Sequence, residues 1–320
     1  MSNKDVVTSE YILLFGDCLE RMKEIPDGSV DLILTDPPYG TVKSIGNSDS
    51  IEHGMKNKTQ WDETLDFKLM WLEINRVLRR NGKCILFSQE PFTSDLIKST
   101  HKNMPFSYRL VWIKDHFANS LIAKKAPVNY FEDICVFQKK FDTQINPLQQ
   151  YLLKEFKVAG KSIAYYKELC GFTGNQPYNW FSPKNDGTKH WCFPKKEHYE
   201  KLQSSGFFQK PYDELMKVES KFESIFNLPK GEKFKSNVFQ YKKDYSGYHP
   251  TQKPVALLED LIKTYSNEGD TVMDFTTGSF STGVACLNTN RNFIGIEMEE
   301  KYFDIGVKRM QESTIKGEIK

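Results

Sequence analysis

Residues 31–40 read DLILTDPPYG and join an apolar run to an unusual turn. The apolar residues at 32–34 predict a strand that is buried in a sheet. The acid, two prolines and tyrosine that follow cannot continue the sheet, because proline has no amide hydrogen to donate to a neighbouring strand. We therefore expect the strand to end in a rigid turn that carries a carboxylate at Asp36 and an aromatic ring at Tyr39.

The composition of this turn suits the recognition of an amino group. The carboxylate of Asp36 and the backbone carbonyl of Pro37 are neighbouring acceptors, and an –NH₂ group has two hydrogens to donate. Pro37 and Pro38 hold the backbone rigid, and the ring of Tyr39 can stack on a planar base. A turn with a purely structural role would not require an acid and an aromatic residue on either side of the prolines. We predict that Asp36, Pro37, Pro38 and Tyr39 are catalytic.

Strands and helices alternate before and after this turn. Apolar runs predict strands at 11–15, 30–35, 83–89, 108–114, 132–140, 270–275 and 293–297. Helical periodicity and stop signals predict helices at 18–25, 67–81, 254–265, 281–290 and 300–313, the second of them stopped by Gly82. Such alternation predicts an α/β fold with a mostly parallel sheet that is covered on both faces.

Residues 141–245 interrupt this alternation. They are rich in lysine and aromatic residues and contain no arginine. We therefore expect residues 1–140 and 246–320 to form one domain and residues 141–245 to be an insertion.

Within the insertion, residues 162–181 read as a helix, a glycine-containing turn and a second helix, as in a helix-turn-helix that lies in the major groove. Asn175, Gln176 and Asn179 would suit adenine edges, and Lys195 and Lys196 would suit phosphates. The alternative is a small helical subdomain that packs on its own aromatic residues.

Two further acids stand at predicted strand ends. Asp274 opens DFTTGSFSTG, a glycine- and serine-rich turn that lets the backbone approach a cofactor. Glu297 ends the next strand, where an acid commonly accepts the hydroxyls of a ribose. The turn lacks G-x-G-x-x-G spacing, so a nucleoside-containing cofactor is favoured over a nicotinamide dinucleotide. The alternative is an ordinary strand-helix turn with a capping acid.

The composition excludes several classes of protein. The net charge is only +2, so a nucleic acid would have to be held by a local basic patch. Six scattered cysteines without a C-x-x-C pair argue against a disulfide framework and a zinc site, and for a reducing cytoplasm. No apolar run is long enough to predict a membrane span. We expect neither a metal nor a membrane partner.

Together these motifs resemble those of the amino-group DNA methyltransferases that use S-adenosylmethionine. DPPY at 36–39 resembles their catalytic motif, in the form more typical of adenine N6 than of cytosine N4 enzymes. HPTQKPVALLEDLI at 249–262 resembles the motif before the cofactor loop, and DFTTGSFSTGVAC at 274–286 resembles the loop itself. GDCLERMKEIPDGSVDLILTDPPYG at 16–40 resembles the usual N-terminal run of that family, and FIGIEMEEKYFDIGVKRM at 293–310 resembles the acidic strand and helix that follow its cofactor loop. The catalytic motif precedes the cofactor loop, as in the permuted β group.

The resemblance implies a permuted, Rossmann-like methyltransferase sheet of the seven-stranded type, with residues 141–245 as a mainly helical target-recognition subdomain. It implies methyl transfer to adenine N6 in double-stranded DNA after the base is flipped out, in a bacterial or viral-encoded cytoplasmic enzyme. Related enzymes are often homodimers. It also assigns S-adenosylmethionine contacts to a set of residues: Asp17 to the adenine, Thr251 and Lys253 to the carboxylate, Asp274, Gly278 and Ser279 to the methionine end, and Glu297 to the ribose.

Three alternatives stay open at this point. The first is cytosine N4 methylation, since the same acceptors can hold either amine. The second is a DNA-binding relative with impaired catalysis, because Phe280 stands where the family loop usually has a second glycine. A weaker third is methylation of RNA or of a protein amide.

Overall fold

The computed structural model describes residues 4–40, 64–118, 123–124, 126–141, 147–174, 177–181, 191–220, 222–249 and 251–318. The chain divides into two compact units. The sheet unit comprises Met1–Lys139 and Ile225–Lys320, and the helical unit comprises Lys140–Ser224.

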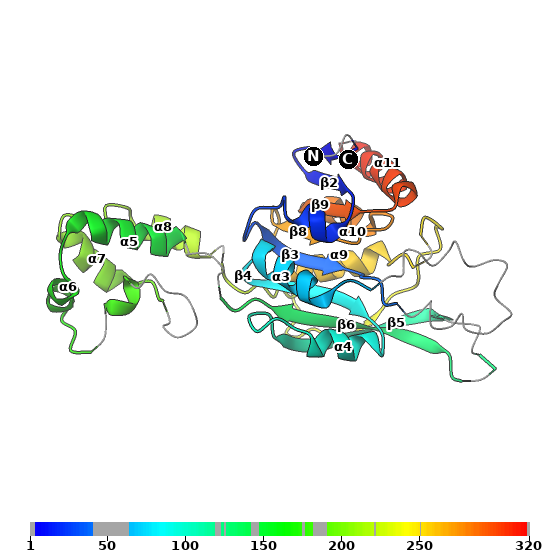
Figure 1. The fold of residues 1–320 in the computed structure, drawn as a ribbon, viewed down its shortest axis with the longest axis horizontal. Coiled ribbons are helices and arrows are strands. Elements are labelled where there is room, and N and C mark those ends of the chain that lie inside the picture. Colours follow the sequence, from blue (N-terminus) through cyan, green and yellow to red (C-terminus); the bar gives the residue numbers. More distant parts are fainter. Residues whose placement is uncertain are drawn as a thin grey trace. The chain divides into compact units, whose positions relative to one another are not determined.

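A single sheet runs through the sheet unit (Figure 1). Its order across the described residues is β1 (Val6–Val7), β2 (Tyr11–Phe15), β9 (Asn292–Glu297), β8 (Thr271–Asp274), β3 (Val30–Thr35), β4 (Leu78–Ser88), β6 (Asn129–Gln138), β5 (Phe106–Ala118) and β7 (Val238–Gln240). The strands are parallel except for β1 at one edge and β6, which is antiparallel to both of its neighbours. Seven central strands are thus extended by two short edge strands. The predicted α/β fold is confirmed.

Helices cover both faces of this sheet (Figure 1). One core joins the sheet to α9 (Val255–Tyr265), α10 (Ser281–Asn288) and α11 (Glu300–Glu318). The other joins it to α1 (Cys18–Met22), α3 (Phe67–Val77) and α4 (Phe92–Lys98). Successive residues of β3 enter opposite cores, Leu32 and Leu34 the first and Ile33 the second, because side chains alternate between the faces of a strand. This is why the run at 32–34 is continuously apolar.

The predicted glycine stop of α3 is wrong. The helix ends at Val77, and Gly82 lies inside β4. A Cβ at Gly82 would stand 2.9 Å from the backbone oxygen of Asp31 on the neighbouring strand. Glycine is therefore required there for close strand packing and not for ending a helix.

The helical unit contains α5 (Pro147–Ala159), α6 (Ile163–Cys170), a 3₁₀ helix (Tyr178–Trp180), α7 (Lys196–Ser204) and α8 (Tyr212–Ser220). These elements pack around buried aromatic side chains, including Tyr166, Trp180, Tyr199 and Phe208. The chain thus builds a separate small core from the aromatic residues that mark this stretch of the sequence.

The described residues of 162–181 do not form the predicted helix-turn-helix. Its first helix is present as α6, which Ser162 caps at the start and Gly171, with a φ of 75°, ends. The second is replaced by the three-residue 3₁₀ helix, whose Trp180 is buried in the aromatic core. Tertiary packing of the aromatic residues therefore overrides the local pattern. Asn175 and Gln176 lie outside the described residues, and Asn179 is half-buried on the 3₁₀ helix.

The C-terminal end of the insertion also differs from the expected position at 245. The helical unit ends at Ser224. Residues 225–245 belong to the sheet unit, where Val238–Gln240 pairs with β5 in parallel and the Val111 N–H donates to the Asn237 carbonyl at 2.8 Å.

Candidate active site

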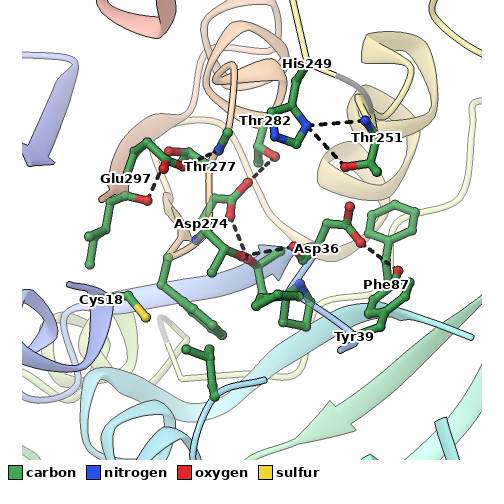
Figure 2. A pocket seen from close by; sticks show the side chains of 18 of the residues that line it. Cys18, Asp36, Tyr39, Phe87, His249, Thr251, Asp274, Thr277, Thr282 and Glu297 are labelled. Carbon is green, nitrogen blue, oxygen red and sulfur yellow. Dashed lines mark hydrogen bonds between the residues drawn. The ribbon is translucent and has the colours of Figure 1, made fainter. Parts of the chain in front are cut away.

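A cavity of about 870 Å³ opens where the carboxyl ends of β3 and β8 meet. The chain leaves β3 toward β4 on one side and β8 toward β9 on the other, and such a reversal is where open α/β sheets bind ligands. All of the residues predicted to be catalytic or to bind the cofactor line this cavity, namely Asp17, Asp36, Pro37, Pro38, Tyr39, Thr251, Lys253, Asp274, Gly278, Ser279 and Glu297. Figure 2 shows several of them around the cavity.

Asp36 stands at the end of β3 with both carboxylate oxygens engaged. Oδ1 accepts a hydrogen bond of 2.6 Å from the Tyr39 hydroxyl, and Oδ2 accepts one from the ammonium of Lys253. The Thr276 hydroxyl donates to the Asp36 carbonyl at 3.2 Å. Burial raises the pKa of Asp36, although Lys253 opposes this. The carboxylate is thus held in one orientation at the cavity.

The ring of Tyr39 packs against Phe92, with centroids 5.1 Å apart and planes tilted by 31°. Its hydroxyl contact with Asp36 fixes the other end of the side chain. An aromatic ring of fixed orientation, that of Tyr39, therefore lies beside the carboxylate of Asp36.

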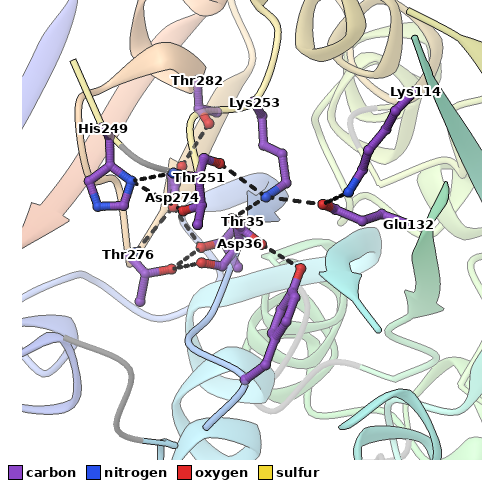
Figure 3. Close-up of polar contacts among 11 residues, drawn as sticks. Thr35, Asp36, Lys114, Glu132, His249, Thr251, Lys253, Asp274, Thr276 and Thr282 are labelled. Carbon is purple, nitrogen blue, oxygen red and sulfur yellow. Dashed lines mark hydrogen bonds and ion pairs between the residues drawn. The ribbon is translucent and has the colours of Figure 1, made fainter. Parts of the chain in front are cut away.

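Lys253 lines the cavity, where its ammonium pairs with Asp36 and lies 3.4 Å from Oε2 of Glu132 on β6 (Figure 3). Burial alone would lower the pKa of Lys253. The carboxylates of Asp36 and Glu132 outweigh the effect of burial, so the pKa of Lys253 is raised. Lys114 on β5 donates to the other oxygen of Glu132. Negative and positive side chains thus alternate from Asp36 on the turn to Lys114 in the sheet.

Glu132 was missed in the sequence. It opens the strand predicted at 132–140, and no local pattern marks it as a site residue. Because β6 runs antiparallel to β4, its first residues lie at the same edge as the last residues of β3. Only the sheet order brings Glu132 to the cavity.

Both carboxylate oxygens of Asp274 accept hydrogen bonds from neighbouring residues. Its two oxygens accept hydrogen bonds of 2.6 Å from the hydroxyls of Thr35 and Thr282, and the Thr276 N–H donates at 3.1 Å. Burial raises its pKa to about 6. Asp274 therefore ties the glycine-rich loop to β3 and to α10.

Glu297 ends β9 and faces the same loop. Oε2 accepts from the Gly278 N–H and Oε1 from the Glu299 N–H, each at 2.8 Å. Burial raises the pKa of Glu297 to about 7, which indicates a carboxylate with too few donors around it. Gly278 adopts a φ of +52°, a conformation that favours glycine. An acid of this kind beside a glycine loop fits the hydroxyl-bearing ribose of S-adenosylmethionine.

Phe280 does not enter the cavity. It adopts a φ of 59° at the start of α10, and its buried ring points into the core against Phe293 and Phe303. The space for the ring exists because Gly306 on α11 and Gly295 on β9 have no side chain there. The loop that turns at Gly278 thus keeps its approach to the cavity despite the missing glycine.

Asp17 and Thr251 border the cavity from opposite ends of the sequence. Asp17 caps α1 by accepting from the Glu20 N–H at 3.1 Å. The Thr251 hydroxyl lies 3.1 Å from Nδ1 of His249, a residue outside the predicted set of site residues. His249 packs against Tyr302 and lines the cavity, and burial lowers its pKa to about 4. The imidazole is therefore neutral at pH 7.

None of the described residues predicted to contact DNA lines the cavity; Asn179, Lys195 and Lys196 belong to the helical unit. Lys195 and Lys196 stand at the start of α7, and the ammonium of Lys196 lies 3.4 Å from Asp213. Across the described ranges, no cluster of three or more His, Cys, Asp or Glu could hold a metal ion. No helix within them is long and apolar enough to cross a membrane.

Two relatives resemble the chain over most of its length. It is 27% identical over 303 residues to the DNA adenine methyltransferase YhdJ of Escherichia coli (strain K12), covering 93% of this chain and 82% of that protein. It is 24% identical over 302 residues to the type II methyltransferase M.HpaI of Haemophilus parainfluenzae, covering 93% and 73%.

Two solved structures share the fold. The M1.HpyAVI–SAM complex has a TM-score of 0.53 at 20% identity, covering 94% of this chain and 98% of that one. The cytosine-N4-specific PvuII DNA methyltransferase has a TM-score of 0.51 at 15% identity, covering 98% and 93%. The model of the N6/N4 family described as DNA methylase matches residues 30–308, from β3 into α11. The chain therefore belongs to the N6/N4 DNA methyltransferases, which take their methyl group from S-adenosylmethionine.

Proposed function

We propose that this enzyme methylates the N6 amino group of adenine in double-stranded DNA, with the target base turned out of the duplex. The observation that carries the proposal is Asp36, an oriented carboxylate followed by the Pro37 carbonyl, in the same cavity as Glu297 and Gly278. The similarity to a relative named as a DNA adenine methyltransferase supports adenine as the target.

In this mechanism, Asp36 and the Pro37 carbonyl accept the two hydrogens of the target amine and direct its lone pair into the cavity. The ring of Tyr39 stacks on the base, which compensates for part of the few kcal/mol needed to unstack it from the duplex. When bound, S-adenosylmethionine supplies a methyl group on a positively charged sulfur. Alignment and electrostatics then provide most of the rate acceleration.

The target amine loses a proton when it gains the methyl group. Asp36 is a suitable acceptor for that proton, because burial raises the pKa of its carboxyl group. A covalent enzyme intermediate is not required. Cys18 lines the cavity, but burial raises the pKa of its thiol to about 12. It therefore stays protonated at neutral pH and is unsuited to act as a nucleophile.

Cofactor contacts are proposed for the residues around the glycine-rich loop. Glu297 would accept from the ribose hydroxyls, and the backbone at Gly278 and Ser279 would face the methionine end. Asp17 would contact the adenine and Thr251 the carboxylate. Lys253 is better suited to Asp36 than to the cofactor carboxylate, since its ammonium is already paired there.

The helical unit is proposed to recognise the target sequence. Its separate aromatic core lets its surface vary without disturbing the sheet unit. Lys195, Lys196 and Asn179 are proposed to contact DNA.

Cytosine N4 is the second candidate, because the fold is shared with the cytosine-N4-specific PvuII enzyme and the same acceptors can hold its amine. DNA from cells that express the protein, digested to nucleosides and analysed by mass spectrometry, separates the two. We expect N6-methyladenine. N4-methylcytosine without N6-methyladenine would replace adenine with cytosine as the target.

Replacing Asp36 tests the catalytic assignment. We expect Asp36→Asn to slow methyl transfer by roughly 10²–10³-fold, as for loss of a group aligned on reacting atoms, and to leave S-adenosylmethionine affinity within about threefold. Exposed Asp304 on α11, changed to Asn, is the control and should retain activity. Methyl transfer by Asp36→Asn at the wild-type rate would show that the acid is not catalytic.

A further inference from the structure

Four charged side chains, two buried and two half-buried, form a row beside the proposed catalytic turn. In order they are Asp36 on the turn after β3, Lys253 before α9, Glu132 on β6 and Lys114 on β5 (Figure 3). The side chains of Lys253 and Lys114 are only 7% and 2% exposed. Two positive and two negative charges balance, which is needed because an unpaired charge at such depth is strongly unfavourable.

The ammonium of Lys253 occupies an acceptor that the target amine needs. Oδ1 of Asp36 accepts from Tyr39, and Oδ2 accepts from Lys253. An ammonium resembles an amine in donating N–H groups. Lys253 thus holds the place of the target base on Asp36 and neutralises the charge that would orient the amine.

A second carboxylate lies ready for the same ammonium. Oε2 of Glu132 is 3.4 Å from the Lys253 nitrogen and accepts no hydrogen bond from the residues that the structure describes. A charge-assisted hydrogen bond of this type is usually 2.7–2.9 Å. A shift of the ammonium by about half an ångström would therefore form it. Phe87, whose ring centroid is 5.1 Å from the nitrogen, and the Thr251 carbonyl, 3.3 Å away, flank this ammonium.

We infer that Lys253 occupies Asp36 until a target base arrives, and that Glu132 then receives its ammonium. Both are positioning residues, since they act through Asp36. The inference rests on the proposed function and deepens it. Transfer of the ammonium to Glu132 restores the full negative charge of Asp36 at the moment the amine binds. It also keeps Lys253 paired, so its buried ammonium is not left alone.

A pair of substitutions tests this order of events. Glu132→Gln removes the receiving charge and leaves Lys253 with Asp36 as its carboxylate partner. We expect single-turnover methyl transfer to an unmethylated plasmid to slow at least tenfold, with plasmid and S-adenosylmethionine affinities within about threefold of wild type. Adding Lys253→Met frees Asp36 again and keeps the buried charges balanced. The paired variant should be at least fivefold faster than Glu132→Gln alone.

The control is another partly buried ion pair outside the cavity. Asp260 accepts from Lys235 and from Tyr241, and Asp260→Asn should stay within twofold of the wild-type rate. A purely structural role for Glu132 would make the paired variant as slow as the single one or slower. That result, or a wild-type rate for Glu132→Gln, overturns the inference.

Folding and function are separated in the same experiment. Thermal unfolding is measured for every variant, and Lys253→Ala replaces Lys253→Met if the methionine pair does not fold. If the wild type transfers no methyl group to DNA, the proposed function fails, and this inference fails with it. If the wild type is active and the paired variant shows no recovery, only the inference fails.

Discussion

Three carboxylates meet at one edge of the sheet, and each has a different set of donors. Asp36 is held by Tyr39 and Lys253, Asp274 by two threonine hydroxyls, and Glu297 by two backbone N–H groups. The two backbone N–H groups at Glu297 compensate least for the cost of burying a charged carboxylate. The pKa of Glu297 is accordingly raised to about 7. A cavity lined by three carboxyl groups suits a positively charged ligand.

This raised pKa predicts how stability depends on pH. Between the ordinary value of 4.5 and about 7, the folded state binds more protons at Glu297 than the unfolded state does, so the free energy of unfolding falls as pH rises through that window. Glu297→Gln removes this dependence, on the order of 3 kcal/mol in total. Denaturant unfolding of both proteins at pH 4.5 and pH 8 measures it.

Asp274 titrates in the same window, with a pKa of about 6. It is present in both proteins, so most of the difference between them comes from Glu297. Equal pH dependence in the two proteins would mean that Glu297 is not perturbed by burial.

At the scale of elements, the contact between α10 and α11 explains the unusual cofactor loop. Phe280 adopts a left-handed conformation, which is unfavourable for a bulky residue. Its ring fills the space in front of Gly306 and Gly295, between α11 and β9. The packing of a large aromatic ring compensates for backbone strain that a glycine would avoid.

We therefore expect Phe280→Ala to destabilise the protein by about 3–5 kcal/mol, as is usual for removal of a buried phenylalanine ring. S-adenosylmethionine affinity of the folded variant should change by less than about threefold, because the ring does not line the cavity. Thermal unfolding and titration calorimetry measure the two effects. Phe234, which is 79% exposed, is the control, and Phe234→Ala should stay within about 0.5 kcal/mol. An unchanged melting temperature for Phe280→Ala would contradict the packing argument.

At the scale of the whole molecule, chemistry and the proposed recognition are divided between two units with separate cores. The cavity is lined by the sheet unit alone. The net charge is only +2, so attraction to DNA must come from local groups of lysines. Because the helical unit contains no arginine, phosphate contacts on it would be made by lysine.

Lys195 and Lys196, at the start of α7, are the two lysines that we predict to contact phosphates. Replacing both by Ala should weaken binding to all DNA sequences alike and reduce the slope of log affinity against log salt by up to roughly 2, at about 0.9 per phosphate contact. Titrations at several salt concentrations measure the slope. The control pair is Lys23 and Lys263, which are exposed and paired with Glu20 and Glu259 on their own helices. An unchanged slope for the α7 pair would place the phosphate contacts on other residues.

Local sequence was sufficient for much of this protein. Strands at 11–15 and 30–35, helix α9 and the turns after β3 and β8 follow from runs of a few residues. Their signals, such as apolar runs, prolines, glycines and strand-end acids, act over one or two turns of chain. The acids could be assigned to one edge because all carboxyl ends of parallel strands lie together.

Other features depended on contacts between distant residues. The start of β4 at Leu78 follows from its pairing with Val30, and the end of the helical unit follows from the pairing of Val238 with Val111. The second half of the expected helix-turn-helix is instead a 3₁₀ helix, because Trp180 is needed in the aromatic core. Each outcome is set by packing partners that no local pattern specifies.

The same holds for the site. The position of Asp36 was readable from its turn, but the pairing with Lys253 joins residues 217 positions apart, and Glu132 arrives on an antiparallel strand. The direction of the Phe280 ring is set by the absence of side chains at Gly295 and Gly306. A motif fixes which chemical groups are present, whereas burial and long-range pairing set their charge and their partners.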